Sequence, residues 1–303
     1  WGPMHWGHAI SKDLIHWEHL PVALYPDEIG TMYSGSMAYD ENNTSGFAKY
    51  GEKPMVAVYT AHNMETGLEQ QCIAYSLDQG KHFEKYYGNP VIKNPGISDF
   101  RDPKAFWNPV RRCWSLVLAA QDRVFFYASQ DMKNWEKTGE FGPEGNHVKG
   151  VWECPDLFEI DGQQIMTCCP QGVDQKGYDY QNVYQCGYFP VEFDLKNKSY
   201  SFGKFQEFDK GFDIYATQTF ADEAGRRILI GWMGIPDADY DNDATVQYDW
   251  IHALTMPREL SFKDGKLLQK PLKEMQELRK NEFHCALSEF TQWEPEDSCF
   301  ELH

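Results

Sequence analysis

Short apolar stretches separated by polar turns set the pattern of this sequence. Runs such as Ala105-Phe106-Trp107 and Leu157-Phe158-Glu159-Ile160 predict strands. Loops rich in Asn, Gly and Asp, such as residues 39–46 and 237–244, are predicted to connect strands within one domain. The clearest helical pattern covers residues 272–280, after Pro271, and predicts only a short helix or linker. Because helical periodicity is otherwise scarce, the pattern predicts an all-β fold.

A short repeat consists of Ser-x-Asp followed by an aromatic-Glu pair. It begins at Ser11, Ser76 and Ser129, at intervals of 65 and 53 residues. An aspartate in this place can cap a tight turn through backbone amides, and the aromatic residue can begin the next strand. The interval approximates one β-propeller blade of about 40–50 residues with generous loops. We interpret the Ser-x-Asp pairs as turn stabilisers rather than catalytic dyads, since they recur wherever a blade turn is needed.

A second series of motifs runs in the same register, about one blade apart. Its members are Tyr33-Ser34-Gly35-Ser36, Phe100-Arg101-Asp102-Pro103, Trp152-Glu153-Cys154-Pro155-Asp156 and Asp213-Ile214-Tyr215-Ala216. In a propeller, the innermost strand of every blade lines one central channel, so residues in the same phase of successive blades are expected to converge. Extrapolation by one blade back from Ser34 falls before Trp1, and we therefore expect a fifth convergent site upstream.

The repeats predict a propeller domain over residues 1–262, with a first blade that is incomplete at the N-terminus. The blades are expected to finish near Met256-Pro257-Arg258-Glu259-Leu260. The remaining residues, 263–303, are too few for an independent domain and are predicted to be a linker and the beginning of a second domain.

Charge and cysteine content narrow the possible partners and compartment. The 28 Lys and Arg residues face 46 Asp and Glu, a net charge of −18, which disfavours nucleic acid and anionic membranes as partners. Every apolar run is shorter than the roughly 18 residues that span a bilayer. The eight cysteines are scattered without a Cys-x-x-Cys pair, which favours a reducing cytoplasm. Secretion stays open, because the sequence starts at Trp1 within a motif.

Two carboxyl groups are candidates for acid–base chemistry. Glu153 lies between Trp152 and Cys154-Pro155, whose apolar bulk is expected to favour its protonated form. Asp102 follows Arg101, which is expected to keep it ionised. Glycoside hydrolysis needs a proton donor and a facing carboxylate, and two carboxyls in opposed environments fit that requirement.

Several histidines and tryptophans could have either a functional or a purely structural role. Two His-x-x-His spacings, His5/His8 and His16/His19, could ligate a metal on a helix, but the region is predicted as strand and turn. We therefore interpret these histidines as structural and expect no metal site. Three tryptophans could be sugar platforms or core residues, and position alone does not decide: Trp1, Trp6 and Trp232.

Taken together, the motifs resemble glycoside hydrolase family 32, the invertase and fructanase family. The signal is specific because several independent motifs occur in the correct order over nearly the whole chain. The stretch 170–183 is most similar to the bacterial sucrose-6-phosphate hydrolase branch. The matching segments are residues 1–9, 16–24, 34–36, 100–104, 152–158, 231–233 and 256–260.

The resemblance implies a five-bladed propeller followed by a β-sandwich. It also implies hydrolysis of terminal β-fructofuranosides with retention, through a fructosyl-enzyme. Carried over by motif, Glu153 is the general acid/base, and Asp102, beside Arg101, holds fructose hydroxyls and stabilises the transition state. Further positions that match the fructose pocket are Trp1, Tyr33, Ser34, Tyr215 and Trp232.

The family nucleophile is an aspartate in an Asn-Asp-Pro-Asn-Gly type motif, which this sequence does not contain. The resemblance and the blade spacing agree in placing it upstream, so we expect the polypeptide alone to be nearly inert. A fructoside-binding fragment or pseudoenzyme, and a fructosyltransferase, are the alternatives.

The expected partner is a small sugar, namely sucrose, sucrose 6-phosphate or a short fructan, and no cofactor is expected. Lysines near the motif loops could contact a phosphate, although solvated surface lysines are the favoured interpretation: Lys104, Lys149 and Lys176.

Overall fold

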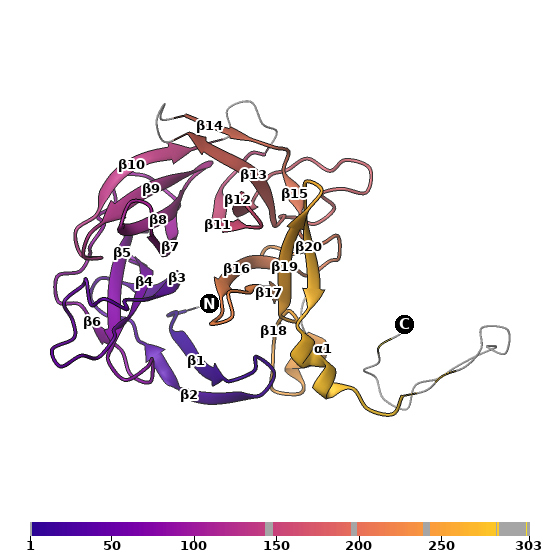
Figure 1. The fold of residues 1–303 in the computed structure, drawn as a ribbon, viewed down its shortest axis with the longest axis horizontal. Coiled ribbons are helices and arrows are strands. Elements are labelled where there is room, and N and C mark those ends of the chain that lie inside the picture. Colours follow the sequence, from indigo (N-terminus) through magenta and orange to yellow (C-terminus); the bar gives the residue numbers. More distant parts are fainter. Residues whose placement is uncertain are drawn as a thin grey trace.

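The computed structural model describes residues 2–142, 148–194, 199–238, 243–282, 284 and 301. Within these residues the chain is almost entirely β-structure, arranged radially around a central axis (Figure 1). Four sheets form the blades of a propeller-like arrangement, and a separate two-stranded sheet lies between the first blade and the last. The predicted all-β, propeller-like fold is confirmed for these four blades.

Each blade is an antiparallel sheet whose innermost strand comes first in the sequence. The two-stranded sheet contains β1 (Trp6–Ser11) and β2 (Trp17–Leu24). The first blade contains β3 (Thr31–Tyr39), β4 (Met55–His62), β5 (Glu69–Ser76) and β6 (Glu84–Lys85). The second contains β7 (Phe100–Asn108), β8 (Cys113–Ala120), β9 (Arg123–Ser129) and β10 (Glu136–Phe141).

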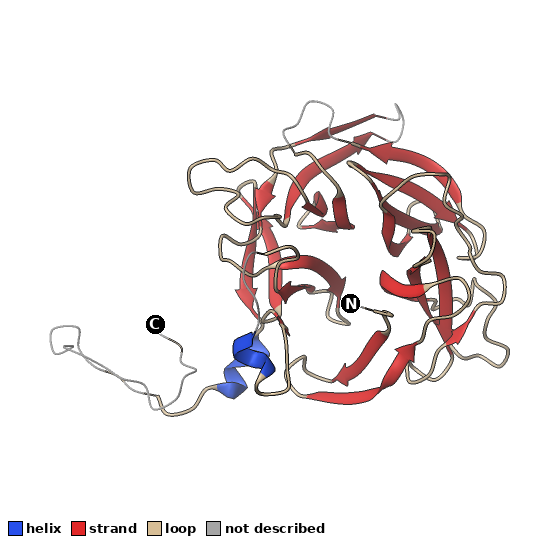
Figure 2. Ribbon diagram, turned by 180° about the vertical axis from the view of Figure 1, so that it is seen from behind, coloured by secondary structure: helices blue, strands red, loops and turns tan. Residues whose placement is uncertain are grey.

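The third and fourth blades have an extra short strand each. The third contains β11 (Trp152–Ile160), β12 (Gln163–Pro170), β13 (Gly187–Asp194), β14 (Ser199–Phe202) and β15 (Gln206–Glu207). The fourth contains β16 (Tyr215–Ala221), β17 (Arg227–Met233), β18 (Ala253–Leu254), β19 (Arg258–Lys263) and β20 (Lys266–Pro271). The helices found within the described residues are the short α-helix α1 (Asp243–Val246) and the 3₁₀-helix η1 (Lys273–Leu278), drawn in blue in Figure 2.

The apolar core is divided into layers between neighbouring sheets. Val56 and Ile73 of the first blade share one cluster with Leu116 and Leu118 of the second. Other clusters join the second blade to the third, the third to the fourth, and the first to the β1–β2 sheet. Because these clusters bury the faces of neighbouring sheets against one another, the innermost strands are held in fixed positions.

The Ser-x-Asp repeats form the turns that the sequence predicted. Ser76 Oγ donates to Asp78 Oδ1 at 2.8 Å, and the same carboxylate accepts the His82 amide at 3.0 Å. The turns at Ser11 and Ser129 have the same arrangement. Each aspartate therefore satisfies backbone amides of its own turn, as expected for a turn stabiliser.

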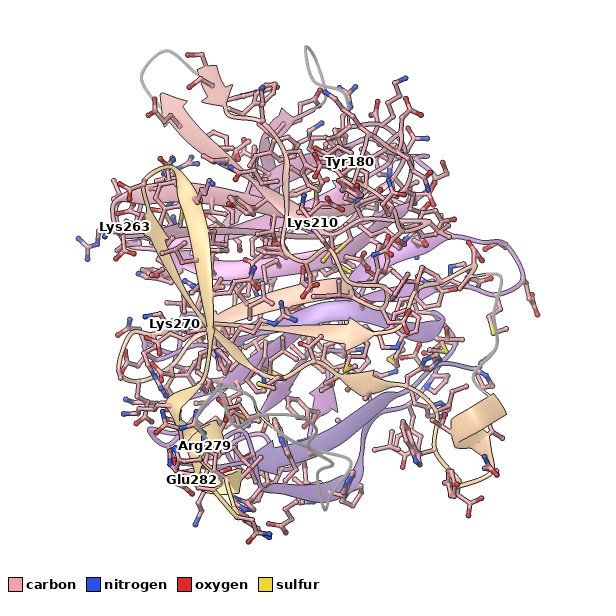
Figure 3. All side chains as sticks on the ribbon, turned by 90° about the vertical axis from the view of Figure 1, so that its right-hand side faces the viewer. Tyr180, Lys210, Lys263, Lys270, Arg279 and Glu282 are labelled. Atoms are coloured by element: carbon pink, nitrogen blue, oxygen red, sulfur yellow. The ribbon has the colours of Figure 1, made fainter. Side chains whose placement is uncertain are left out.

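The fourth blade continues past the predicted domain boundary at residue 262. Strands β19 and β20 pair from Arg258↔Pro271 to Lys263↔Lys266, so that boundary divides a hairpin. Its tip carries the positive φ of Asp264, 51°, followed by Gly265, a turn signal that sequence reading did not weigh. Figure 3 shows this hairpin, with Lys263 and Lys270, along the edge of the molecule. The propeller-like part therefore extends through Pro271.

Residues 273–278 form the short helix that the pattern after Pro271 predicted. Most of residues 283–303 lie outside the described residues, and so does the predicted start of a second domain. In the described part of the chain, no helix is long and apolar enough to span a membrane.

Candidate active site

All four innermost strands have a break in their pairing register near their first residues. The shifts occur between Met32 and Gly35 in β3, between Arg101 and Lys104 in β7, and at the matching places in β11 and β16. Three residues in these bulges have positive φ: Asp102 at 63°, Cys154 at 51° and Ala216 at 49°. The second series of motifs identified in the sequence coincides with these bulges.

A β-bulge turns side chains away from the regular alternation of a strand. Gly35 makes the first bulge possible, because a side chain there would meet the Val58 carbonyl oxygen at 2.1 Å. The innermost strands are the first strand of each blade and surround the central axis (Figure 1). The opening residues of β7, β11 and β16 share one end of the channel, because Arg101 and Tyr215 both donate to Glu153. Residues far apart in the sequence are thereby brought to a single site.

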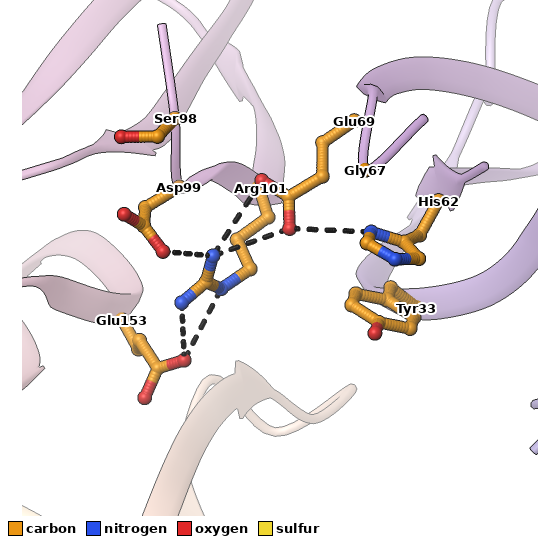
Figure 4. Close-up of a pocket in the computed structure, with 8 residues that line it drawn as sticks. All are labelled: Tyr33, His62, Gly67, Glu69, Ser98, Asp99, Arg101 and Glu153. Atoms are coloured by element: carbon orange, nitrogen blue, oxygen red, sulfur yellow. Dashed lines mark hydrogen bonds and ion pairs between the residues drawn. The ribbon is translucent and has the colours of Figure 1, made fainter. Parts of the chain in front are cut away.

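A pocket of about 480 Å³ opens at this end (Figure 4). Tyr33 and His62 stack on one side with ring centroids 4.4 Å apart and an interplanar angle of 1°. Arg101 and Glu153 lie across from this stack. The lining residues are Tyr33, His62, Gly67, Glu69, Ser98, Asp99, Arg101 and Glu153.

Glu153 is surrounded by donors. Arg101 approaches its Oε1, with Nη2 at 2.9 Å and Nε at 3.1 Å. The Tyr215 hydroxyl donates to Oε2 at 2.6 Å, and Gln171 Nε2 donates to the same oxygen at 2.7 Å. The side chain is 16% exposed, so it still reaches the pocket. The expected apolar environment is not found at the carboxylate, because Trp152 turns into the aromatic core between the second and third blades.

Arg101 is fixed by three carboxylates. Its Nη1 donates to Asp99 Oδ1 at 2.7 Å and lies 3.2 Å from Glu69 Oε1, while the opposite edge of the guanidinium faces Glu153. Glu69 also accepts the Phe100 amide at 2.7 Å, so it anchors both the backbone and the side chain at the start of β7. The arginine is therefore pre-positioned against Glu153.

Asp102 lies buried next to the pocket. Its Oδ2 accepts the Cys154 amide at 2.9 Å, which connects it to the residue that follows Glu153. Burial, together with the charge of Glu153, raises the pKa of Asp102 to about 7, although Arg101 and the Cys154 amide oppose the shift. Burial outweighs Arg101, which lowers the pKa of Asp102 as expected but makes its ion pairs with other carboxylates. The expectation that Arg101 keeps Asp102 fully ionised therefore does not hold.

Polar side chains connect the innermost strands of successive blades. Ser36 of β3 donates to the Pro103 carbonyl of β7 at 2.8 Å and accepts the Ala105 amide at 3.0 Å. Asp102 of β7 accepts the Cys154 amide of β11 at 2.9 Å. Asp156 of β11 accepts the Thr219 hydroxyl of β16 at 2.6 Å. These links hold the bulges in register with one another.

The lysines proposed as phosphate contacts are not in the pocket lining. Lys104 Nζ lies 3.3 Å from Asp156 and donates to Gln218, within the connection between the third and fourth blades. Lys149 and Lys176 are exposed on loops. The interpretation of these two as surface lysines is consistent with the structure.

The remaining predicted residues lie at different depths around the site. Tyr215 is buried and reaches Glu153, as described above. Ser34 is exposed in the β3 bulge and is not among the lining residues. Trp232 pairs with Tyr215 across β16 and β17 and packs its ring against His252, with centroids 4.8 Å apart. Trp1 lies outside the described residues.

Sequence reading missed four residues that shape the pocket. His62 and Glu69 are directly paired across β4 and β5, and Gln171 follows the end of β12, the strand paired with β11. Asp99 directly precedes the Phe100-Arg101 motif, and that adjacency was the one available signal. The other three depend on pairing between strands, which the motif spacing does not reveal. Among the described residues, no group of three or more His, Cys, Asp or Glu is arranged to hold a metal.

A propeller-like domain with buried and pocket-facing carboxyls at the channel end is the kind of domain that can cleave glycosidic bonds. Residues 1–271 match the family model described as the glycosyl hydrolases family 32 N-terminal domain. The chain belongs to glycoside hydrolase family 32, and the resemblance seen in its motifs is confirmed.

Named relatives and solved structures agree with this assignment. A levanase of Bacillus subtilis (strain 168) is 45% identical over 297 residues, covering 92% of this chain and 42% of the levanase. A sucrose-6-phosphate hydrolase of Escherichia coli is 38% identical, covering 92% of this chain and 58% of that protein. A Bombyx mori GH32 β-fructofuranosidase, solved with sucrose, has a TM-score of 0.79 at 36% identity, covering 94% of this chain and 60% of its own. The chain spans about two fifths to three fifths of the length of these relatives.

Proposed function

We propose that this domain hydrolyses terminal β-fructofuranosides with retention of configuration, through a fructosyl-enzyme intermediate. The observation that carries the proposal is the position of Glu153, whose carboxylate faces the pocket while donors from three other residues fix both of its oxygens. Further support comes from the relatives, which are named as levanase, sucrose-6-phosphate hydrolase and β-fructofuranosidase.

Glu153 would act as the general acid/base. In the first step it gives its proton to the glycosidic oxygen while the bond to the anomeric carbon breaks and a carboxylate nucleophile bonds to that carbon. In the second step Glu153 takes a proton from the attacking water, which releases fructose and restores the nucleophile. Tyr215, Gln171 and Arg101 would hold the carboxyl in position through both steps.

Asp102 and Arg101 would hold the fructose in position. A carboxyl with a pKa near 7 can accept or donate a hydrogen bond at neutral pH, which suits contact with sugar hydroxyls. We further propose that Tyr33 contributes a wall of the fructose pocket, since its ring faces the cavity. The other residues proposed to contact the sugar are Trp1, Ser34, Tyr215 and Trp232.

The nucleophile is proposed to be an aspartate on a segment that precedes Trp1. A retaining mechanism requires a second carboxyl about 5–5.5 Å from the acid. The other carboxyls of the described pocket lining, Glu69 and Asp99, both bind Arg101. In this proposal, β1 and β2 belong to a fifth blade whose innermost strand carries the nucleophile, and a β-sandwich follows the propeller.

Fructose release from sucrose tests the proposal, with a protein that includes the preceding segment. We expect Glu153→Gln to lower kcat by about 10²–10⁴-fold, the range for loss of general acid–base catalysis. Glu159→Gln is the matched control, because Glu159 is exposed on the same strand, β11, and should leave turnover unchanged. Equal activity of the two variants would remove Glu153 from the mechanism.

A further inference from the structure

The pocket carries excess negative charge. Glu69, Asp99 and Glu153 provide three carboxyls, whereas Arg101 is the one lysine or arginine among the described lining residues. Leaving His62 aside, the net charge is −2 with all three ionised, or −1 with Glu153 protonated. The net charge of the whole chain, −18, has the same sign and adds to the negative potential of the pocket.

The single guanidinium has little capacity left for another anion. Its Nε and Nη2 both contact Glu153, and its Nη1 contacts Asp99 and Glu69. An arginine that recognises phosphate usually presents two parallel N–H groups to it. Both edges of the Arg101 guanidinium already face carboxylates, so a phosphate would have to displace one of these carboxylates.

Two further cations close to the site, Lys104 and Arg123, are also paired with carboxylates. Lys104 is only 14% exposed and is held by Asp156. Arg123 lines a neighbouring hollow that shares Asp99 with the pocket, but it is bound by Asp122 at 3.0 Å and Glu140 at 3.0 Å. In the described part of the chain, then, neither hollow presents a lysine or arginine that is not already paired.

We propose that this site selects uncharged fructosides and discriminates against fructosides that carry a phosphate ester. A phosphate ester brings a charge of about −1.5 to −2 at neutral pH. The carboxyls at the pocket repel this charge, and no unpaired lysine or arginine among the described lining residues of either hollow offsets it. Sucrose and unmodified fructans carry no such charge. The inference rests on the proposed function, of which it narrows the substrate class.

Sucrose and sucrose 6-phosphate are compared at pH 7.5 in a protein that includes the segment before Trp1. We expect kcat/KM for sucrose to exceed that for sucrose 6-phosphate at least about 10-fold at low salt. The preference should narrow at high salt, because added ions screen the repulsion. Binding of both sugars is measured in parallel by calorimetry. Absence of turnover would then count against the proposed function alone, while the affinity ratio still tests the selectivity.

The variant Asp99→Asn tests whether the negative charge of the pocket causes the preference for sucrose. Removing this charge should raise the ratio of kcat/KM for sucrose 6-phosphate to kcat/KM for sucrose by about 3-fold or more. Asp264→Asn is the matched control, since Asp264 is exposed in the β19–β20 turn and should leave the ratio unchanged. Equal or better use of sucrose 6-phosphate by the unaltered protein, in turnover and in binding, would overturn the inference.

Discussion

The site depends on a few residues whose partners lie far away in the sequence. Glu153 and Asp102 were identified from short motifs, because a motif reports which residue types stand side by side. Their environments could not be predicted this way. Arg101, adjacent to Asp102 in sequence, pairs with Glu153, 52 residues away, and the Glu69 that anchors it lies on another blade. Sequence adjacency is a poor guide to contact in a strand, where neighbours point to opposite faces.

Asp102 gives a stability prediction with a definite sign. Its pKa is about 7 in the folded chain, against an ordinary value of 3.8. The folded state therefore binds a proton more tightly, and this contribution to stability is lost as pH rises between these values. Asp102→Asn removes the buried charge, so it should stabilise the chain by about 1–3 kcal/mol more at pH 8 than at pH 5.

Urea denaturation at the two pH values measures this difference. The amide can still accept the Cys154 hydrogen bond, so the fold should be retained. If Asp102→Asn raises the free energy of unfolding equally at both pH values, or more at pH 5, then Asp102 does not have a raised pKa in the folded chain.

At the scale of elements, the bulges and the links between innermost strands arrange the chemistry. The sequence showed where these segments lie, since the four motifs of the second series recur about one blade apart. It did not show that they are bulges, because a register shift is a property of two strands. The pairing of β19 with β20 was missed for a different reason, because the Asp264-Gly265 turn signal between them was not weighed.

A substitution of Ser36 tests how much the hydrogen bonds between innermost strands contribute to stability. Its hydroxyl satisfies both the Pro103 carbonyl and the Ala105 amide in a buried position. Ser36→Ala should lower the free energy of unfolding by about 1–3 kcal/mol, because two backbone groups lose their partner. Ser199→Ala, at an exposed position in β14, should change it by less than about 0.5 kcal/mol. If both variants unfold at the same urea concentration, the link contributes nothing to stability.

The whole molecule is a ring of sheets that share core layers and bring one end of each innermost strand to a common pocket. The spacing of the Ser-x-Asp repeats, together with that of the second series of motifs, predicted this radial arrangement. The number of blades and the second domain are still predictions.

At this scale, adding the segment proposed to precede Trp1 tests where the nucleophile lies. We expect the extended protein to release fructose from sucrose at least about 10³-fold faster than the 303-residue chain, because it would contain the proposed nucleophile. Rapid turnover by the shorter chain would show that the nucleophile lies within it.

The central claim is that Glu153 gives the proton to the departing sugar. Its most direct test compares sucrose, whose leaving group needs protonation, with 4-nitrophenyl β-fructofuranoside, whose leaving group does not. For Glu153→Gln in the extended protein, kcat/KM for sucrose should fall about 10²–10⁴-fold, and for the nitrophenyl fructoside at least about 10-fold less. Equal losses on both substrates, or none on sucrose, would contradict the account.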